Sequence, residues 1–281
     1  MSKLLYAVDK CNVKNKSLQR MYSKPVTLTF QFNNMDNCIK INYLPGGGRD
    51  QSDKRELSGA TGATGCSLWD PSIALSHFLS DHFCSSSING KKYKFPKCKF
   101  DFDGWSPKTV VELGSGIGLC SVVAGKVFGA QTDGSCHVIS TDGDDNVCKL
   151  LRDNIQLNDF SDNTVEARKV NWGIKGKELR NAIGLSSVKE ISLIMASGCI
   201  YGSDPNNWKA LFKTIRSLCK HKSKALIILS HGNGAAPGVF EGTGNFYNDF
   251  VKKKFNVYIV PPNFLNPKYR EGCSIHLLWR L

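Results

Sequence analysis

Apolar and polar residues alternate in two short runs near the start of the chain. The runs are Val26 to Phe32 and Cys38 to Leu44, and the polar residues 33–37 separate them. Alternation of this kind favours β-strands with one buried face, and a connection of this length is typical of a hairpin. We therefore expect an N-terminal β-hairpin, followed by a flexible, glycine-rich loop over residues 45–65.

Beyond residue 65 the pattern becomes that of a helix and then of alternating strands and helices. Residues 70–83 repeat apolar positions at helical spacing, with Asp70 and Pro71 at the start. From residue 109, short apolar runs alternate with amphipathic segments, an order typical of a parallel α/β sheet. The predicted strands are 110–113, 137–141, 164–170, 191–196, 225–229, 256–260 and 275–279, and the predicted helices are 116–127, 146–157, 208–218 and 246–253.

A loop, and no helix, joins the last two predicted strands. Parallel neighbours need a long crossover connection, which is usually a helix. The missing helix therefore predicts an antiparallel pair at the edge of the sheet. The residues between 84 and 108 are rich in serine, lysine and proline, and we interpret them as an inserted surface loop.

Composition narrows the class of protein. The 281 residues are 41% hydrophobic and 22% charged, which is enough apolar material for a core and argues against disorder. No apolar run approaches the ~20 residues of a membrane-spanning helix. The apolar stretch 4–8 is shorter than the core of a secretory signal. We expect a cytoplasmic, monomeric protein that does not enter a membrane.

Cysteine and histidine spacing argues against disulfides and metal sites. The eleven cysteines include no CxxC pair, and the six histidines form no HxH or HExxH motif. We therefore expect a reducing compartment and no metal.

The net charge of +13 is uneven along the chain, because residues 1–100 alone carry a net charge of +8. The densest basic part is Lys91 to Lys99, which is interleaved with Tyr93 and Phe95. Such a run is typical of a solvated loop, and it also suits contact with an acidic protein surface or a nucleic acid. Because Lys reads bases less well than Arg, nucleic acid is the less favoured partner.

A glycine-rich turn follows the first strand of the α/β region. It reads Glu112-Leu113-Gly114-Ser115-Gly116-Ile117-Gly118. Glycines let the backbone approach a ligand at the carboxyl edge of a sheet. The spacing is neither GxGxxG nor that of a P-loop, and Glu112 would repel a pyrophosphate. An acid here favours a cationic ligand, such as the amino-acid end of S-adenosylmethionine.

A carboxylate, Asp142, ends the second strand of this region. At that position it can accept hydrogen bonds from both hydroxyls of an adenosine ribose. The alternative is that Asp142 caps the next helix, but Asp144 or Asp145 fits that role better. The glycine turn and Asp142 together predict a ligand that contains adenosine.

These motifs, taken in chain order, resemble a known family. The chain resembles the class I, seven-strand S-adenosylmethionine-dependent methyltransferases. The segments that carry this resemblance are Val111 to Leu119, Thr141-Asp142, Asn154-Ile155-Gln156-Leu157-Asn158 and Asn171-Trp172-Gly173. A narrower similarity, to the protein-lysine methyltransferases that modify elongation factors, heat-shock chaperones and calmodulin, is carried by Leu68-Trp69-Asp70-Pro71 and Ser197-Gly198-Cys199-Ile200-Tyr201. The resemblance covers residues 26–281.

The resemblance implies an α/β fold with a Rossmann-like, seven-stranded, mostly parallel sheet, an antiparallel last strand and an N-terminal β-hairpin extension. Residues 1–65 would form the hairpin and flexible loop, and residues 66–281 the methyltransferase domain. It also implies S-adenosyl-L-methionine as the cofactor. The methyl acceptor would be a lysine of a protein, such as an elongation factor or chaperone with an acidic surface.

The resemblance also implies roles for particular residues. Those assigned to the cofactor are Trp69, Glu112, Gly114, Ser115, Gly116, Asp142, Trp172 and Ser197. Tyr201 would be the catalytic residue and would line the pocket for the lysine. Packing in the core is the alternative for the two tryptophans and for Tyr201. Trp172 has only Asn171 and Gly173 beside it, and this favours stacking on a purine.

One departure from the family bears on catalysis. The family usually has an acidic residue three positions before the tyrosine, and this chain has Gly198 there. The first alternative is therefore a non-catalytic protein that binds S-adenosylmethionine or serves in interactions. The second is methylation of RNA or a small molecule. The Asn/Asp-Pro-Pro-Tyr motif of base methyltransferases does not follow the fourth strand, which argues against a base substrate.

Overall fold

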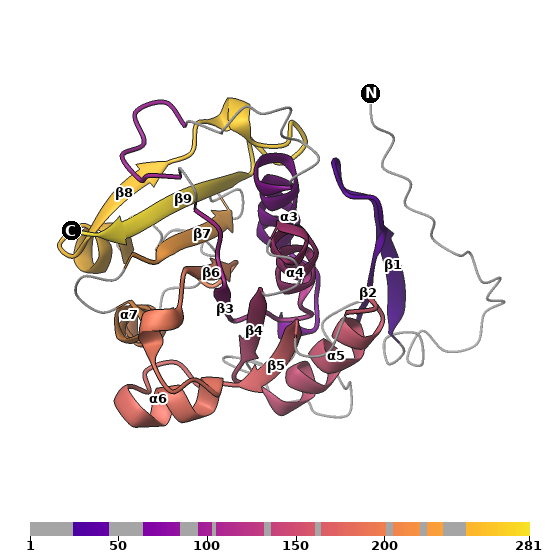
Figure 1. The fold of residues 1–281 in the computed structure, drawn as a ribbon, viewed down its shortest axis with the longest axis horizontal. Coiled ribbons are helices and arrows are strands. Elements are labelled where there is room, and N and C mark those ends of the chain that lie inside the picture. The colour runs from indigo at the N-terminus through magenta and orange to yellow at the C-terminus, as the bar shows by residue number, and fades with distance from the viewer. Residues whose placement is uncertain are drawn as a thin grey trace, which may run out of the picture.

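A twisted seven-stranded sheet forms the centre of the computed structural model (Figure 1). The structure describes residues 25–44, 64–84, 95–102, 105–131, 136–160, 164–200, 205–219, 224–232 and 246–281. The strands, in sheet order, are β5 (Val165–Lys169), β4 (His137–Asp142), β3 (Thr109–Leu113), β6 (Leu193–Ser197), β7 (Leu226–Gly232), β9 (Cys273–Arg280) and β8 (Phe255–Ile259). The first five of these pair in parallel, and β9 runs antiparallel to both β7 and β8. The predicted α/β fold and its antiparallel edge are confirmed.

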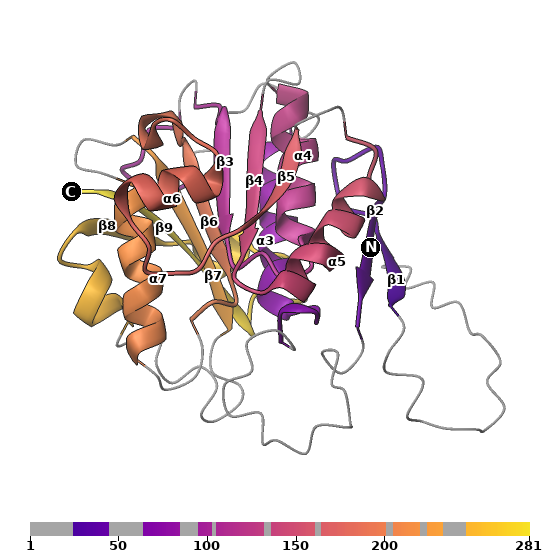
Figure 2. The same ribbon diagram turned by 90° about the horizontal axis from the view of Figure 1, so that it is seen from below.

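Helices cover the two faces of the sheet (Figure 2). On one face lie α3 (Asp70–Phe83), α4 (Leu119–Gln131) and α5 (Asp145–Gln156), and on the other lie α6 (Gly176–Ile183) and α7 (Pro205–Leu218). Successive side chains of a strand point to opposite faces. Val110 of β3 therefore packs into the cluster under α3 and α4, and Val111 packs into the cluster under α6 and α7.

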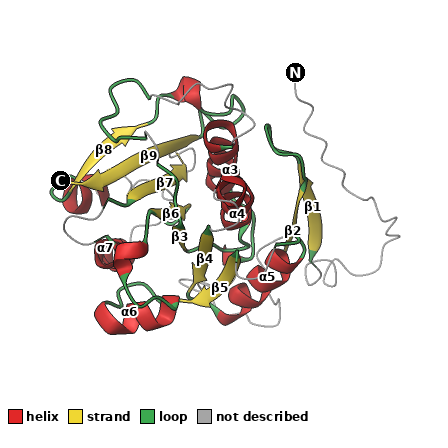
Figure 3. Cartoon of the chain, in the orientation of Figure 1, coloured by secondary structure: helices red, strands yellow, loops and turns green. Residues whose placement is uncertain are grey.

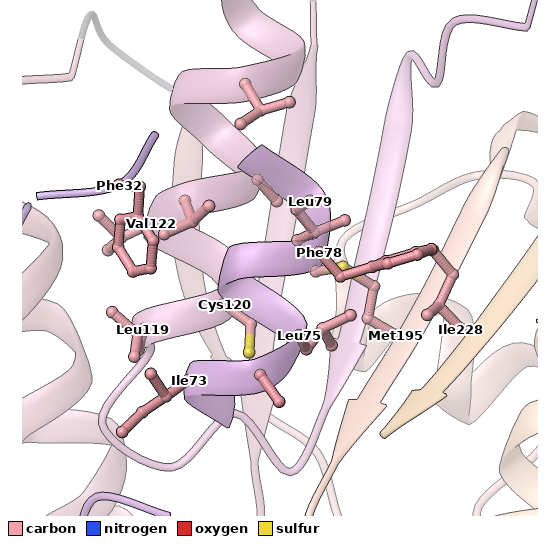
Figure 4. Close-up of a cluster of buried hydrophobic side chains, with 14 of the residues drawn as sticks. Phe32, Ile73, Leu75, Phe78, Leu79, Leu119, Cys120, Val122, Met195 and Ile228 are labelled. Carbon is pink, nitrogen blue, oxygen red and sulfur yellow. The ribbon is translucent and has the colours of Figure 1, made fainter. Parts of the chain in front are cut away.

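The N-terminal hairpin forms a separate two-stranded sheet of β1 (Val26–Phe30) and β2 (Ile39–Tyr43), as Figure 3 shows. Its inward side chains, with Phe32 just beyond β1, are buried in the same cluster as α3 and α4. In Figure 4, Phe32 lies against Val122 of α4. The predicted hairpin is confirmed, while the domain boundary after residue 65 stays a prediction.

Three features differ from the sequence expectations. α6 was not predicted, because Leu179 and Ile183 are its only buried residues. The predicted helix over 246–253 is a single π-helical turn, Tyr247–Val251. Phe95 belongs to the core, where it packs against Phe78 and other aromatic rings, so it does not face a partner. Lys91 to Lys94 lie outside the described residues.

The described residues contain neither a membrane-spanning helix nor a cluster of metal ligands. No helix among them is both long and apolar enough to cross a membrane. No group of three or more His, Cys, Asp or Glu side chains in the described ranges is arranged to hold a metal ion.

A ligand cavity at the carboxyl edge of the sheet

A cavity of about 390 Å³ opens where β3, β4 and β6 end. The residues after β5, at 170–172, and the start of α7 complete its wall. All the residues that the resemblance assigned to the cofactor line this cavity: Trp69, Glu112, Gly114, Ser115, Gly116, Asp142, Trp172 and Ser197. Tyr201 lies outside the described residues.

The glycine turn after β3 has left-handed backbone conformations that only glycine adopts without strain. Gly114, Gly116 and Gly118 have φ values of 65°, 54° and 87°. A Cβ atom on Gly116 would also lie 2.9 Å from the carbonyl oxygen of Gly65. The glycines are therefore needed for contacts within the chain, and they leave the backbone of the turn open to the cavity.

Asp142 joins this turn to β4 and α5. Its carboxylate accepts hydrogen bonds from the backbone N–H groups of Gly116 and Asp144, each at 3.1 Å. Asp144 is the residue that caps α5, since its side chain accepts from the N–H groups of Asn146 and Val147. Each carboxylate oxygen of Asp142 keeps a second lone pair for a ligand. Burial raises the pKa of Asp142, and the backbone N–H groups oppose this shift.

Glu112 is buried beneath the turn, with 1% of its surface exposed. Burial raises its pKa to about 7, and hydrogen bonds from Ser121, Ser115 and Cys120 oppose the shift. The side chain also lines the cavity. Because desolvation disfavours its charge, a cationic group bound beside it would restore the ionised form.

The cavity differs in charge from the rest of the protein. Among the described residues, its lining includes three acids, Glu112, Asp142 and Asp144, and no Lys, Arg or His, although the whole chain has a net charge of +13. Such a lining attracts a positively charged ligand and repels phosphate. A nicotinamide or flavin dinucleotide, which carries a pyrophosphate, is therefore a poor match. This agrees with the prediction that Glu112, just before the glycines, would repel a pyrophosphate.

Two tryptophans stand at this cavity. Trp172 is half-buried, and its Cζ2 atom would lie 3.0 Å from a Cβ on Gly114. Trp69 is 45% exposed and donates from Nε1 to the Thr64 carbonyl at 2.9 Å. Core packing is thus excluded for Trp69, whereas Trp172 combines a cavity wall with packing on the cluster under α7.

A family model described as lysine methyltransferase matches residues 53–236. The chain belongs to the lysine methyltransferase family. It is 30% identical over 240 residues to the protein-lysine N-methyltransferase EFM3 of Chaetomium thermophilum, across 80% of this chain and 60% of that protein. It is 33% identical over 128 residues to the calmodulin-lysine N-methyltransferase of Arabidopsis thaliana, across 44% of this chain and 37% of that protein.

The chain therefore spans less than two thirds of the length of these curated relatives. Among solved structures, a SAM dependent methyltransferase from Aquifex aeolicus is similar, with a TM-score of 0.44 and 14% identity over 63% of this chain and 85% of that one.

S-adenosyl-L-methionine is the cofactor of this methyltransferase family. The described residues at the cavity fit it, since the cofactor carries a sulfonium and an ammonium, and the part of the lining that the structure describes is acidic and contains no base. The carboxylate of Asp142 would suit ribose hydroxyls as an acceptor, and the half-buried ring of Trp172 would suit a purine as an apolar wall.

Several residues that line the cavity were not predicted. Thr64 and Gly65 fall at the end of the stretch interpreted as a flexible loop, and the position of Gly65 in a glycine tract was the available signal. Asn207 and Ala210 come from one face of α7. Neither residue type is distinctive, so the sequence offered no signal for them.

Proposed function

We propose that the chain transfers a methyl group from S-adenosyl-L-methionine to the side-chain amine of a lysine in another protein. The observation that supports this most strongly is the acidic cavity, whose described lining contains no basic side chain, in a chain of the lysine methyltransferase family. The names of both curated relatives describe lysine methylation, one of them on calmodulin.

Particular residues would hold the cofactor. Asp142 would accept hydrogen bonds from the ribose hydroxyls, and Glu112 would face the ammonium group. Trp172 would lie along the adenine, while Trp69 and Ser197 would lie beside the methionine portion. When bound, the cofactor supplies a methyl group that its sulfonium already activates. The protein's part is therefore mainly to orient the amine and exclude water.

The acceptor lysine needs a partly dry site. Its ammonium has an ordinary pKa of about 10.4, and a poorly solvated pocket favours the neutral, nucleophilic amine. Gly198 lines the cavity beside exposed Trp69, and among the described atoms a Cβ at Gly198 would meet the Trp69 Cβ alone, at 4.0 Å. This opening is where we place the lysine, with Tyr201 as the proposed catalytic residue that follows it along the chain.

A basic cleft beside the cavity supports a partner with an acidic surface. A cleft of about 390 Å³ is lined by Lys175, Lys213 and Arg216, with Gly173 and Ser217, and none of its described lining residues is an acid. Gly173 follows Trp172 of the cofactor cavity directly. A protein with acidic side chains around the target lysine, such as an elongation factor or chaperone, would match both sites. Its lysine would enter the acidic cavity, and its acidic side chains would face the basic cleft. We propose that the protein acts as a monomer in the cytoplasm.

One observation favours a second candidate, a protein that binds the cofactor without turnover. Gly198 stands where the family usually has an acid that orients the amine, and it has a φ of 65°. The lining therefore offers no carboxylate at this position.

The proposed activity is tested by transfer of a radiolabelled methyl group into a lysate from cells that lack this protein. The proposal expects label in a protein band that survives nuclease and yields methyl-lysine on acid hydrolysis. Label removed by nuclease would support RNA methylation. If cofactor binds and no component is labelled, the non-catalytic candidate is supported. The Asp142→Ala variant serves as the control for label that does not depend on the cofactor site.

A further inference from the structure

Two asparagines, Asn154 on α5 and Asn158 just after it, bond to the N-terminal hairpin as a neighbouring strand would. The Asn158 side chain accepts from the Lys40 N–H at 2.9 Å and donates to the Lys40 carbonyl at 2.7 Å. The Asn154 side chain does the same with Asn42, at 2.7 and 2.9 Å. A side-chain amide has the same donor and acceptor as a peptide group, so the pair satisfies the free edge of β2. Figure 1 shows α5 beside β2.

Asn154 makes one contact that Asn158 does not. Its amide also donates to the carbonyl oxygen of Ile117 at 2.8 Å. Ile117 lies between Gly116 and Gly118 in the turn that lines the cofactor cavity. The second bond from the Asn158 amide goes to the Asn154 carbonyl, in the last turn of α5, at 2.7 Å. Asn154 is completely buried, so water cannot replace any of its three bonds.

The hairpin reaches the cavity from a second side. The N–H of Leu44, the residue after β2, donates to the Cys66 carbonyl at 3.0 Å. Residues 64 and 65, just before Cys66, line the cavity. The Gly65 carbonyl lies so close to Gly116 that a Cβ on Gly116 would be 2.9 Å from its oxygen. The position of β2 therefore bears on both walls of this part of the cavity.

We propose that Asn154 is a positioning residue for the cofactor: it holds the glycine turn through Ile117 and couples docking of the hairpin to cofactor affinity. This inference rests on the proposed function, since it assumes that the cavity binds the cofactor. Coupling of this kind is reciprocal, so the cofactor also stabilises the docked hairpin. A merely structural role would predict that Asn154 and Asn158 are equivalent, because each makes the same pair of bonds to β2.

The test compares Asn154→Ala with the matched control Asn158→Ala in calorimetric titrations with S-adenosylhomocysteine. Both variants lose a pair of bonds to the hairpin, and both should melt at a lower temperature. We expect about tenfold weaker binding in Asn154→Ala, the equivalent of one lost hydrogen bond. Asn158→Ala should weaken binding only about twofold, because it loosens the hairpin but leaves the bond from Asn154 to Ile117 in place. Equal affinities for the two variants would overturn the inference.

A measurement on the unaltered chain covers the case in which Asn154→Ala does not fold. Amide hydrogen exchange of residues 39–43 is followed with and without S-adenosylhomocysteine. Coupling predicts that the ligand slows exchange at Asn42, whose N–H is held by Asn154. Unchanged exchange there, with protection confined to the glycine turn, would contradict the coupling. A wild-type chain that does not bind the ligand would instead refute the proposed function.

Discussion

Cofactor affinity should depend on pH through Glu112. This carboxyl is 1% exposed, and its pKa is raised from 4.5 to about 7, chiefly by burial. In the empty cavity it is therefore mostly protonated below pH 7 and mostly ionised above it. The ammonium of the cofactor is bound favourably only by the ionised form. Affinity for S-adenosylhomocysteine should thus rise with pH through the neutral range.

The size of this effect follows from the fraction of Glu112 that is ionised. With a pKa of about 7, roughly one tenth is ionised at pH 6 and roughly nine tenths at pH 8. The apparent Kd should therefore be about tenfold higher, and binding weaker, at pH 6 than at pH 8.

The raised pKa of Glu112 also affects the free energy of unfolding. It favours the native state below pH 4.5, and this advantage is lost as the pH rises to about 7. The loss amounts to roughly 3 kcal/mol at 1.36 kcal/mol per pKa unit.

The assay is calorimetric titration of the wild type and of Glu112→Gln between pH 6 and pH 8. The Gln variant should bind more weakly at pH 8 and show a flat pH profile. Its melting temperature at pH 8 should exceed that of the wild type, because no charge is buried. A flat wild-type profile, or a Gln variant that keeps the slope, would refute the role given to Glu112.

Three other substitutions probe the cavity and the cleft. Asp142→Ala should weaken S-adenosylhomocysteine binding about tenfold or more by calorimetry, because charge-assisted bonds to the ribose are lost; unchanged affinity would exclude the ribose role. Gly198→Asp should speed methyl transfer relative to the matched control Gly198→Ala, with both variants melting a few degrees lower from about 1 kcal/mol of backbone strain at positive φ. Equal rates in the two would show that the carboxylate is dispensable. Replacing Lys175, Lys213 and Arg216 by Ser should raise the KM for the protein substrate at low salt and leave cofactor affinity unchanged, and the increase in KM should become smaller as salt is added. An effect on KM that does not depend on salt would show that the cleft takes no part in substrate docking.

Much of the fold could be predicted because the central strands carry a strong signal. β3 is buried over its whole length, so its apolar run marked it clearly. The glycine turn was predictable for the same kind of reason, since positive φ at Gly114, Gly116 and Gly118 restricts the residue type. The prediction that Asp144 or Asp145, and not Asp142, caps α5 is confirmed, and the cap is Asp144, which accepts from two backbone N–H groups.

Other parts depended on contacts that are distant in sequence. α6 buries only two side chains, too few for a clear helical period. Phe95 was grouped with the neighbouring lysines, but an aromatic cluster from several separate segments encloses it. Asn154 belonged to a recognised motif, yet its bonds to Asn42 and Ile117 join three segments and show their purpose only in three dimensions.

The identity of the methylated atom tests the central claim most directly. A lysate from cells lacking this protein is incubated with the chain and a cofactor that carries a deuterated methyl group, and the labelled protein is fragmented in a mass spectrometer. The proposed function predicts that the heavy methyl groups lie on the side-chain nitrogen of a lysine. It also predicts that this label is lost with Asp142→Ala. Heavy methyl groups on a different kind of side chain, or on RNA, would contradict it.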